Sequence, residues 1–163
     1  MGIEIERKFL VDPSRFFPPA SGSVIRQGYL VRTPDRSVRV RLTRRPAETG
    51  EVDASAALTI KGPDGLARLE YEYQIPADEA AELLDTLCLA GEIRKTRYVV
   101  DVEGRNFEVD VYDGVHAGLI TAEVELASVH EAVVLPDWVT KEVTGDPAWT
   151  NAALSRAEAG PVD

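Results

Sequence analysis

Apolar and polar residues alternate along much of this chain, and a period of two is the period of a β-strand. In the first ten residues, Glu4, Glu6 and Lys8 fall on one face of such a strand, and Ile3 and Phe9 fall on the other. Taken alone, this pattern is typical of the solvent-exposed face of an antiparallel sheet. Similar patterns predict eight strands, over residues 1–10, 24–31, 37–43, 56–61, 66–75, 93–102, 105–112 and 119–127.

Helix signals are few and lie between or after these strands. Apolar residues recur at helical spacing from Ala80 to Leu87, after Pro76, which predicts one clear helix. A short helical turn is expected over residues 15–17, and Asp146-Pro147 predicts a last helix to about Ala157. Because strands and helices do not alternate regularly, we expect an antiparallel α+β fold in one domain, residues 1–163. Eight strands suit closure into a β-barrel.

Composition places the chain among globular proteins and excludes several kinds of partner. Its 163 residues carry 28% charged and 44% hydrophobic residues and a formal net charge of −10. A field of that sign opposes non-specific binding to nucleic acid or to an anionic membrane. Cys88 is the only cysteine, so no internal disulfide can form. No signal peptide or long apolar run is seen, and we expect a cytoplasmic protein.

The charges that alternate along the predicted strands are sorted by sign. Carboxylate pairs occupy the first, seventh and last strands, at Glu4 and Glu6, Glu108 and Asp110, and Glu123 and Glu125. If the barrel closes between its first and last strands, two pairs lie roughly 5 Å apart. Such a group requires a cation, and ligation by oxygen alone favours Mg²⁺ or Mn²⁺. His116 and His130 are the only histidines and are expected in loops.

The same alternation sends a large set of cations into the barrel lumen. Buried cations in this number are costly unless a polyanion pairs with them, and arginine binds phosphate oxygens in bidentate fashion. The pattern therefore predicts a compact chain of phosphates as ligand, with Ile3, Ile5 and Phe9 packing outward against the helices. The cations concerned are Lys8, Arg39, Arg41, Lys61, Lys95 and Arg97.

These motifs resemble the CYTH family, also called triphosphate tunnel metalloenzymes. Glu4-x-Glu6-x-Lys8 is similar to the ExExK signature of that family, and further stretches follow in the family order nearly to the end of the chain. They are Gln27-Gly28-Tyr29-Leu30, Val38-Arg39-Val40-Arg41, Thr59-Ile60-Lys61, Arg68-Leu69-Glu70-Tyr71-Glu72, Lys95-Thr96-Arg97-Tyr98, Glu108-Val109-Asp110-Val111-Tyr112, Glu123-Val124-Glu125-Leu126 and Glu142-Val143-Thr144-Gly145-Asp146. The resemblance implies an eight-stranded tunnel that hydrolyses or cyclises triphosphates with Mg²⁺ or Mn²⁺.

The resemblance also implies roles for the charged residues. Phosphates would be bound by the six cations given above, and Tyr29 and Lys95 would act near the leaving group or the attacking water. Glu70 and Glu72 would bind a second metal or orient the cations. A structural ion pair with Glu70 or Glu72 is the alternative for Lys61 and Arg97, and packing is the alternative for Tyr29. The metal ligands would be Glu4, Glu6, Asp110, Glu123 and Glu125.

The function expected on this basis is metal-dependent hydrolysis of a small triphosphate, with inorganic tripolyphosphate favoured because no module for a nucleotide base is seen. Alternatives are a class IV-like adenylate cyclase, a thiamine triphosphatase and a non-catalytic polyphosphate-binding module. A thiamine triphosphatase would need an aromatic or acidic platform at the tunnel mouth. The expected partners are the small triphosphate and, as a possibility, a second copy of the chain, with no nucleic acid and no membrane.

Overall fold

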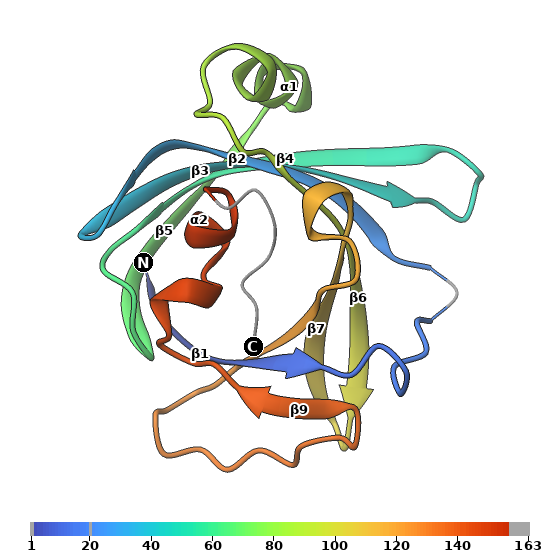
Figure 1. Ribbon diagram of the computed structural model, residues 1–163. Helices are drawn as coiled ribbons and strands as arrows, with labels where there is room; N and C mark the ends of the chain where they lie inside the picture. Colours follow the sequence, from blue (N-terminus) through green and yellow to red (C-terminus); the bar gives the residue numbers. More distant parts are fainter. Residues whose placement is uncertain (1, 20, 157–163) are drawn as a thin grey trace.

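The computed structural model describes residues 2–19 and 21–156, and its centre is a closed antiparallel barrel (Figure 1). The strand order is β5-β4-β3-β2-β6-β7-β8-β1, and pairing of β1 with β5 closes the barrel. The expected fold class, an eight-stranded antiparallel barrel with few helices, is therefore confirmed. The strands are β1 (Gly2–Val11), β2 (Ser23–Thr33), β3 (Arg36–Pro46), β4 (Val52–Lys61), β5 (Ala67–Ile75), β6 (Ile93–Val102), β7 (Arg105–Tyr112) and β8 (Ile120–Glu125).

The first strand closes the barrel by dividing its length between two neighbours. Gly2–Ile5 pair with β5, and residues 6–10 pair with β8. Beyond the end of β5, the free edge of β1 is taken by a ninth short strand, β9 (Val139–Glu142). The sequence did not predict β9, because four residues are too short to show a period. It lies on β1 outside the eight strands of the barrel.

Helices cover one part of the barrel surface. The expected helix is confirmed as α1 (Ala77–Thr86), which starts after Pro76 with acidic residues in its first turn. Its apolar side, including Ala80 and Leu84, packs on Val40 and Leu42 of β3. Residues 15–17 do not form the expected helical turn, since the turn lies at residues 13–15.

The C-terminal segment differs from the single helix expected from residue 146. Asp146 caps a 3-10 helix, η2 (Pro147–Trp149), by accepting from the Ala148 N–H. Thr150 then adopts an extended backbone and caps α2 (Asn151–Leu154). The chain therefore breaks at Thr150 because its hydroxyl competes for a helix N-terminus. The expected end at Ala157 lies outside the described residues. Figure 1 shows this segment across one end of the barrel.

The main core lies outside the barrel. Phe9, Phe107 and Val109 point outward and are buried with Trp138 and Phe16, which come from the segments that cover β1 and β7. The expectation that Ile3, Ile5 and Phe9 pack against helices is therefore wrong. Phe9 packs in this aromatic cluster instead, and Ile3 is 65% exposed.

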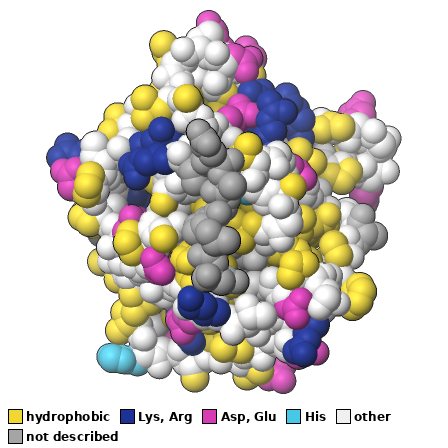
Figure 2. All heavy atoms as spheres, in the orientation of Figure 1, with side chains coloured by type: hydrophobic (Ala, Val, Ile, Leu, Met, Phe, Trp, Pro, Cys, Tyr) yellow, Lys and Arg dark blue, Asp and Glu magenta, His cyan; other side chains and the backbone are white. Residues whose placement is uncertain are grey.

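His116 was expected in a loop, and the structure corrects this expectation as well. It lies in the 3-10 helix η1 (Gly114–His116) and is buried, with Nε2 2.8 Å from the Leu154 carbonyl oxygen. His130 is an exposed loop residue, as expected. Among the described helices, none is long and apolar enough to cross a membrane. On the face shown in Figure 2, the basic side chains form separate groups instead of one continuous surface.

The outer aromatic cluster should dominate the stability of the barrel. Phe107 is fully buried and packs edge-on against Trp138, with ring centroids 5.9 Å apart. Phe107→Ala should lower the free energy of unfolding by about 3–5 kcal/mol, because it leaves a cavity in a packed core. Urea titration measures this loss. The control Val134→Ala, at an exposed loop position, should change stability by less than ~0.5 kcal/mol. Equal effects of the two variants would contradict the placement of the core.

Candidate active site

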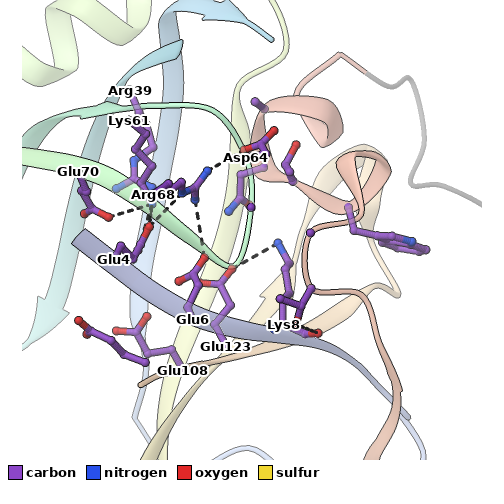
Figure 3. A pocket seen from close by; sticks show the side chains of 18 of the residues that line it. Glu4, Glu6, Lys8, Arg39, Lys61, Asp64, Arg68, Glu70, Glu108 and Glu123 are labelled. Atoms are coloured by element: carbon purple, nitrogen blue, oxygen red, sulfur yellow. Dashed lines mark hydrogen bonds and ion pairs between the residues drawn. The ribbon is translucent and has the colours of Figure 1, made fainter. Parts of the chain in front are cut away.

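The register of the barrel places charged residues of seven of its strands on the inside, whereas other charges, such as Arg7 and Arg26, lie on the outer face. Paired residues in an antiparallel sheet point the same way. Arg39 pairs with Thr59, Thr59 with Glu72, and Lys61 with both Ser37 and Glu70. On the other side, Lys8 pairs with Glu123 and Glu123 with Glu108. Apart from Thr59, which lies behind them, these side chains line a cavity of about 800 Å³ (Figure 3).

The adjacency expected between the first and last strands is present. Glu6 lies opposite Glu125, and Lys8 lies opposite Glu123. The Lys8 Nζ is 3.3 Å from Glu123. Burial alone would raise the pKa of Glu123, but Lys8 and Arg97 hold it at about 2, so Glu123 is ionised.

Glu4 is already paired with cations. Its carboxylate accepts hydrogen bonds from Lys61 Nζ at 2.8 Å and from Arg68 Nε at 3.1 Å (Figure 3). Burial opposes ionisation, yet Lys61, with smaller contributions from Glu70 and Arg68, lowers the pKa of Glu4 to about 2. Lys61 is also 3.2 Å from Glu70. The ion pair of Lys61 with Glu70, one of the alternatives from sequence, is therefore present.

Glu6 has a surplus of negative charge around it. Burial, Glu123 and Glu4 raise its pKa to about 8. Its nearest cation is Arg68, whose Nη2 is 3.7 Å away and which also binds Glu4 and Asp64. This carboxyl therefore lacks a cation of its own.

A second group of ion pairs lies at the other side of the lumen. Asp110 is buried and accepts from Lys95 Nζ at 2.7 Å and from two nitrogens of Arg97 at 2.7 and 2.8 Å. Burial opposes ionisation of Asp110, but Arg97 and Lys95 hold its pKa far below the usual range. Arg97 also binds Glu108, at 2.6 Å, and not Glu70 or Glu72. The sequence thus anticipated a structural pairing for Arg97 but named the wrong partners.

Lys95 is placed differently from the other predicted phosphate ligands. It is fully buried, and its ammonium contacts Asp110 and, at 3.4 Å, the Asn151 amide oxygen. It is absent from the residues that line the cavity, whereas Tyr29 lines it. Burial lowers the pKa of Lys95 to about 7, and Asp110 offsets part of that effect.

Arg39 and Arg41 form the cationic wall of the cavity. No carboxylate among the described residues forms an ion pair with either of them. Burial, Arg39 and Arg97 lower the pKa of Arg41 to about 9, so the guanidinium remains charged at neutral pH. Their strand, β3, stands four strands from β8 in either direction around the barrel. The free arginines therefore face the wall that carries Glu123 and Glu125.

The fit of a divalent cation depends on the acidic wall. Glu4, Glu6, Glu123 and Glu125 all line the cavity, whereas Asp110 is held behind it by Lys95 and Arg97. Within the described ranges, no three acidic, His or Cys side chains are already gathered to hold a metal. The donors are all carboxylate oxygens, which suit Mg²⁺ or Mn²⁺. The raised pKa of Glu6 shows that one of them needs a positive charge, so the set fits such an ion.

The comparisons with known proteins agree with this geometry. The family model of the CYTH domain matches residues 2–147. The chain belongs to the CYTH domain family. A relative from Acetivibrio thermocellus, named inorganic triphosphatase, is 43% identical, with 94% of each chain covered. Another inorganic triphosphatase, from Nitrosomonas europaea, is 37% identical over 93% of this chain and 96% of its own. A crystal structure of an inorganic triphosphatase superposes with a TM-score of 0.65 at 32% identity, covering 98% of this chain and 99% of the other.

Several residues of this CYTH site were not singled out from sequence. Arg68 binds Glu4 and Asp64, and its place in an alternating strand beside Glu70 and Glu72 was a signal. Asn151 enters the cavity from α2, and no local pattern marks it. Gln27 and Thr59 are neutral and buried, so a search for charges passes over them.

The electrostatics of Glu6 predict a pH dependence of stability. The pKa of Glu6 in the folded protein is about 8, above the usual value of 4.5 for a glutamate. The folded state therefore binds the proton more tightly, and this contribution to stability is present at low pH and is lost as the pH rises toward 8. Glu6→Gln should gain stability relative to the parent protein by on the order of 2 kcal/mol between pH 5.5 and 8.5.

Thermal or urea unfolding in EDTA at both pH values measures this difference. EDTA removes divalent cations, which would otherwise stabilise the ionised carboxylate. Groups distant from Glu6 titrate equally in both proteins and cancel in the comparison, so the difference reports on Glu6 and the neighbours coupled to it. Parallel stability curves for the two proteins would show that Glu6 is not in an acidic environment.

Proposed function

We propose that this CYTH protein hydrolyses inorganic tripolyphosphate in a metal-dependent reaction within the tunnel. The observation that carries the proposal is the 43% identity to an inorganic triphosphatase over nearly the whole of both chains. The cavity supports it, because one wall carries unpaired arginines and the opposite wall carries carboxylates. A chain of phosphates with its cation matches both walls.

Arg39 and Arg41 bind the phosphate oxygens in this proposal, because their charge is not cancelled by a carboxylate. Lys8, Lys61 and Arg97 line the same cavity and contribute charge that their ion pairs partly neutralise. Fixed cations around the phosphates stabilise the charge that develops in the transition state. The tunnel walls also limit the water that reaches the phosphates.

Glu6, Glu123 and Glu125, with Glu4, would hold Mg²⁺ or Mn²⁺, and Asp110 supports the site through Arg97. When bound, the ion polarises the phosphoryl oxygens and neutralises their charge. Glu70 orients Lys61, and Glu72 orients Arg39 through Thr59. Both therefore serve to position cations in this proposal, in place of binding a second metal.

Tyr29 and Lys95 are proposed to act on protons near the leaving group or the attacking water. The Tyr29 ring is almost fully buried, and burial raises the pKa of its hydroxyl, which keeps it protonated. Lys95, with a pKa of about 7, exchanges a proton easily at neutral pH. Since Lys95 does not line the cavity, its contact with the cavity residue Asn151 places its ammonium next to the site where such a proton would move.

The lining argues against a substrate with an organic base. Tyr29 and Trp149 are the aromatic residues among the described lining, and they are 4% and 6% exposed. Neither presents a face on which adenine or thiamine could stack. The described lining therefore offers no aromatic platform for adenine or thiamine, and a purely inorganic substrate requires none.

A substrate screen tests the proposed function. Tripolyphosphate, ATP and thiamine triphosphate are each incubated with Mg²⁺ or Mn²⁺, and released phosphate and cyclic AMP are measured. We expect orthophosphate from tripolyphosphate, with a kcat/KM at least ~10-fold above those for the other two. Cyclic AMP from ATP would favour the cyclase. Binding of tripolyphosphate without turnover would favour a polyphosphate-binding module.

Glu125→Gln is the cleanest test of the acidic wall, because Glu125 lines the cavity without an ion pair that its loss would break. It should lower kcat by roughly 100-fold or more at saturating metal while leaving the melting temperature unchanged.

Arg39→Ala should lower kcat/KM for tripolyphosphate by a similar factor. Unchanged kinetics in either variant would remove that residue from the site.

We propose further that two copies of the chain associate through the outer face of β4, β5 and the start of β1. Ile3 lies opposite Leu69, and Ile60 lies opposite Tyr71, so these residues and Tyr73 form one continuous apolar face. All five are exposed by more than a third. A contiguous group of exposed apolar side chains of this kind often marks a surface that contacts another protein. No outward position of β4 or β5 carries a charge, so two chains of net charge −10 meet there with least repulsion.

Sedimentation at micromolar concentration tests this association. The parent protein should sediment as a dimer, and Tyr73→Lys should sediment as a monomer, because a twofold contact places the new charges near each other. Val115→Lys, at an exposed position in η1, should remain dimeric. A monomeric parent protein, or a dimeric Tyr73→Lys variant, would contradict the proposal.

A further inference from the structure

Two arginines of the cavity are held in a way that distinguishes them from the other basic residues. Arg39 and Arg41 contact neutral side chains, and no carboxylate in the described part of the chain pairs with them. Their neighbours in the lumen all have carboxylate partners; these are Lys8, Lys61, Arg68, Lys95 and Arg97.

Gln27 holds Arg41. The two residues lie directly opposite each other on β2 and β3, and the Arg41 Nε donates to the Gln27 Oε1 at 3.1 Å. Because a guanidinium has only donors, the carbonyl oxygen of the amide must face it. The side chain of Gln27 is fully buried, and its Nε2 has no hydrogen-bond partner among the described residues. An amide left half satisfied in a core is costly, which indicates that its position serves Arg41.

Thr59 holds Arg39. It is fully buried on β4, opposite Arg39 in the register, and its hydroxyl accepts from Arg39 Nη2 at 3.2 Å. The same hydroxyl donates to Glu72 at 3.3 Å. The threonine hydroxyl therefore bridges the guanidinium and Glu72, which lies opposite Thr59 on β5. A direct ion pair with Glu72 would cancel the charge of Arg39, whereas the bridged contact leaves the guanidinium without a carboxylate partner among the described residues.

We propose that Gln27 and Thr59 are positioning residues that fix Arg41 and Arg39 by neutral hydrogen bonds and so keep both guanidinium charges available to the substrate anion. The inference rests on the proposed triphosphatase function. A carboxylate in either position would orient the arginine equally well but would compete with phosphate for it. A neutral acceptor orients the cation at the cost of leaving its charge uncompensated, and a bound anion removes that cost.

Gln27→Glu tests the inference because it keeps the shape and the acceptor and adds only a charge. We expect its affinity for inorganic tripolyphosphate, measured by calorimetry without added metal, to fall about 10-fold, which is ~1.4 kcal/mol. KM should rise accordingly, with a smaller change in kcat. The melting temperature should stay level or rise, because a buried ion pair replaces a neutral contact. A merely structural glutamine would give a variant with unchanged affinity.

The role of Thr59 can be tested with two variants, one that keeps the hydroxyl group and one that lacks it. Thr59→Ser retains the hydroxyl and should bind tripolyphosphate like the parent protein. Thr59→Val retains the shape but frees Arg39 from its anchor, and should weaken binding by about 5–10-fold. In an Arg41→Ala background, Gln27→Glu should have a much smaller effect than in the parent, since the residue acts through Arg41.

The outcomes separate this inference from the proposed function. Parent affinity in Gln27→Glu, or equal affinities in the two Thr59 variants, would overturn the positioning roles while leaving the triphosphatase intact. A parent protein that neither binds nor hydrolyses tripolyphosphate would overturn the proposed function itself. If Gln27→Glu fails to fold by circular dichroism, the Thr59 pair still decides the question for Arg39.

Discussion

Closure of a barrel with strictly alternating strands decides where the charges of this protein lie. A closed sheet has one enclosed face, and every second residue of each strand must occupy it. Here the enclosed face receives a dense set of acidic and basic residues, and most of the buried apolar residues of the strands lie on the outward face. The core is therefore a layer around the barrel, between its strands and the segments that cover them, as the contacts of Phe9 and Phe107 with Trp138 show.

Charges confined in this way must be compensated within the lumen. Most are, through pairs such as Lys61 with Glu4 and Arg97 with Asp110. Removing one partner of such a pair typically costs several kcal/mol, so the pairs fix the geometry of the tunnel. The groups without a full partner are informative for the same reason. Arg39 and Arg41 on one side lack a carboxylate, and Glu6 on the other has a pKa of about 8 because its neighbours are acidic.

Sequence reasoning predicted the barrel, the helix α1 and most of the charged residues that line the cavity, because these depend on periodicity. Pairing of side chains depends on register and on side-chain length, which periodicity does not contain. Lys95 and Arg39 occupy similar positions in alternating strands. Lys95 is bound by Asp110 and does not line the cavity, whereas Arg39 does. The break at Thr150 was missed because the cap at Asp146 concealed a second cap four residues later. The roles assigned to these side chains in catalysis and binding stay predictions.

The acidic wall and the arginine wall of the tunnel together explain how the substrate can stabilise the protein and also be hydrolysed by it. An acidic group with a raised pKa and an arginine with a lowered pKa both carry electrostatic cost in the free protein. A polyanion that carries a divalent cation removes both costs at once, which neither component does alone. These charged groups interact most strongly with the phosphates in the transition state, where the most charge develops. A tunnel whose walls carry charged groups without full partners is therefore suited to a small substrate with a high charge.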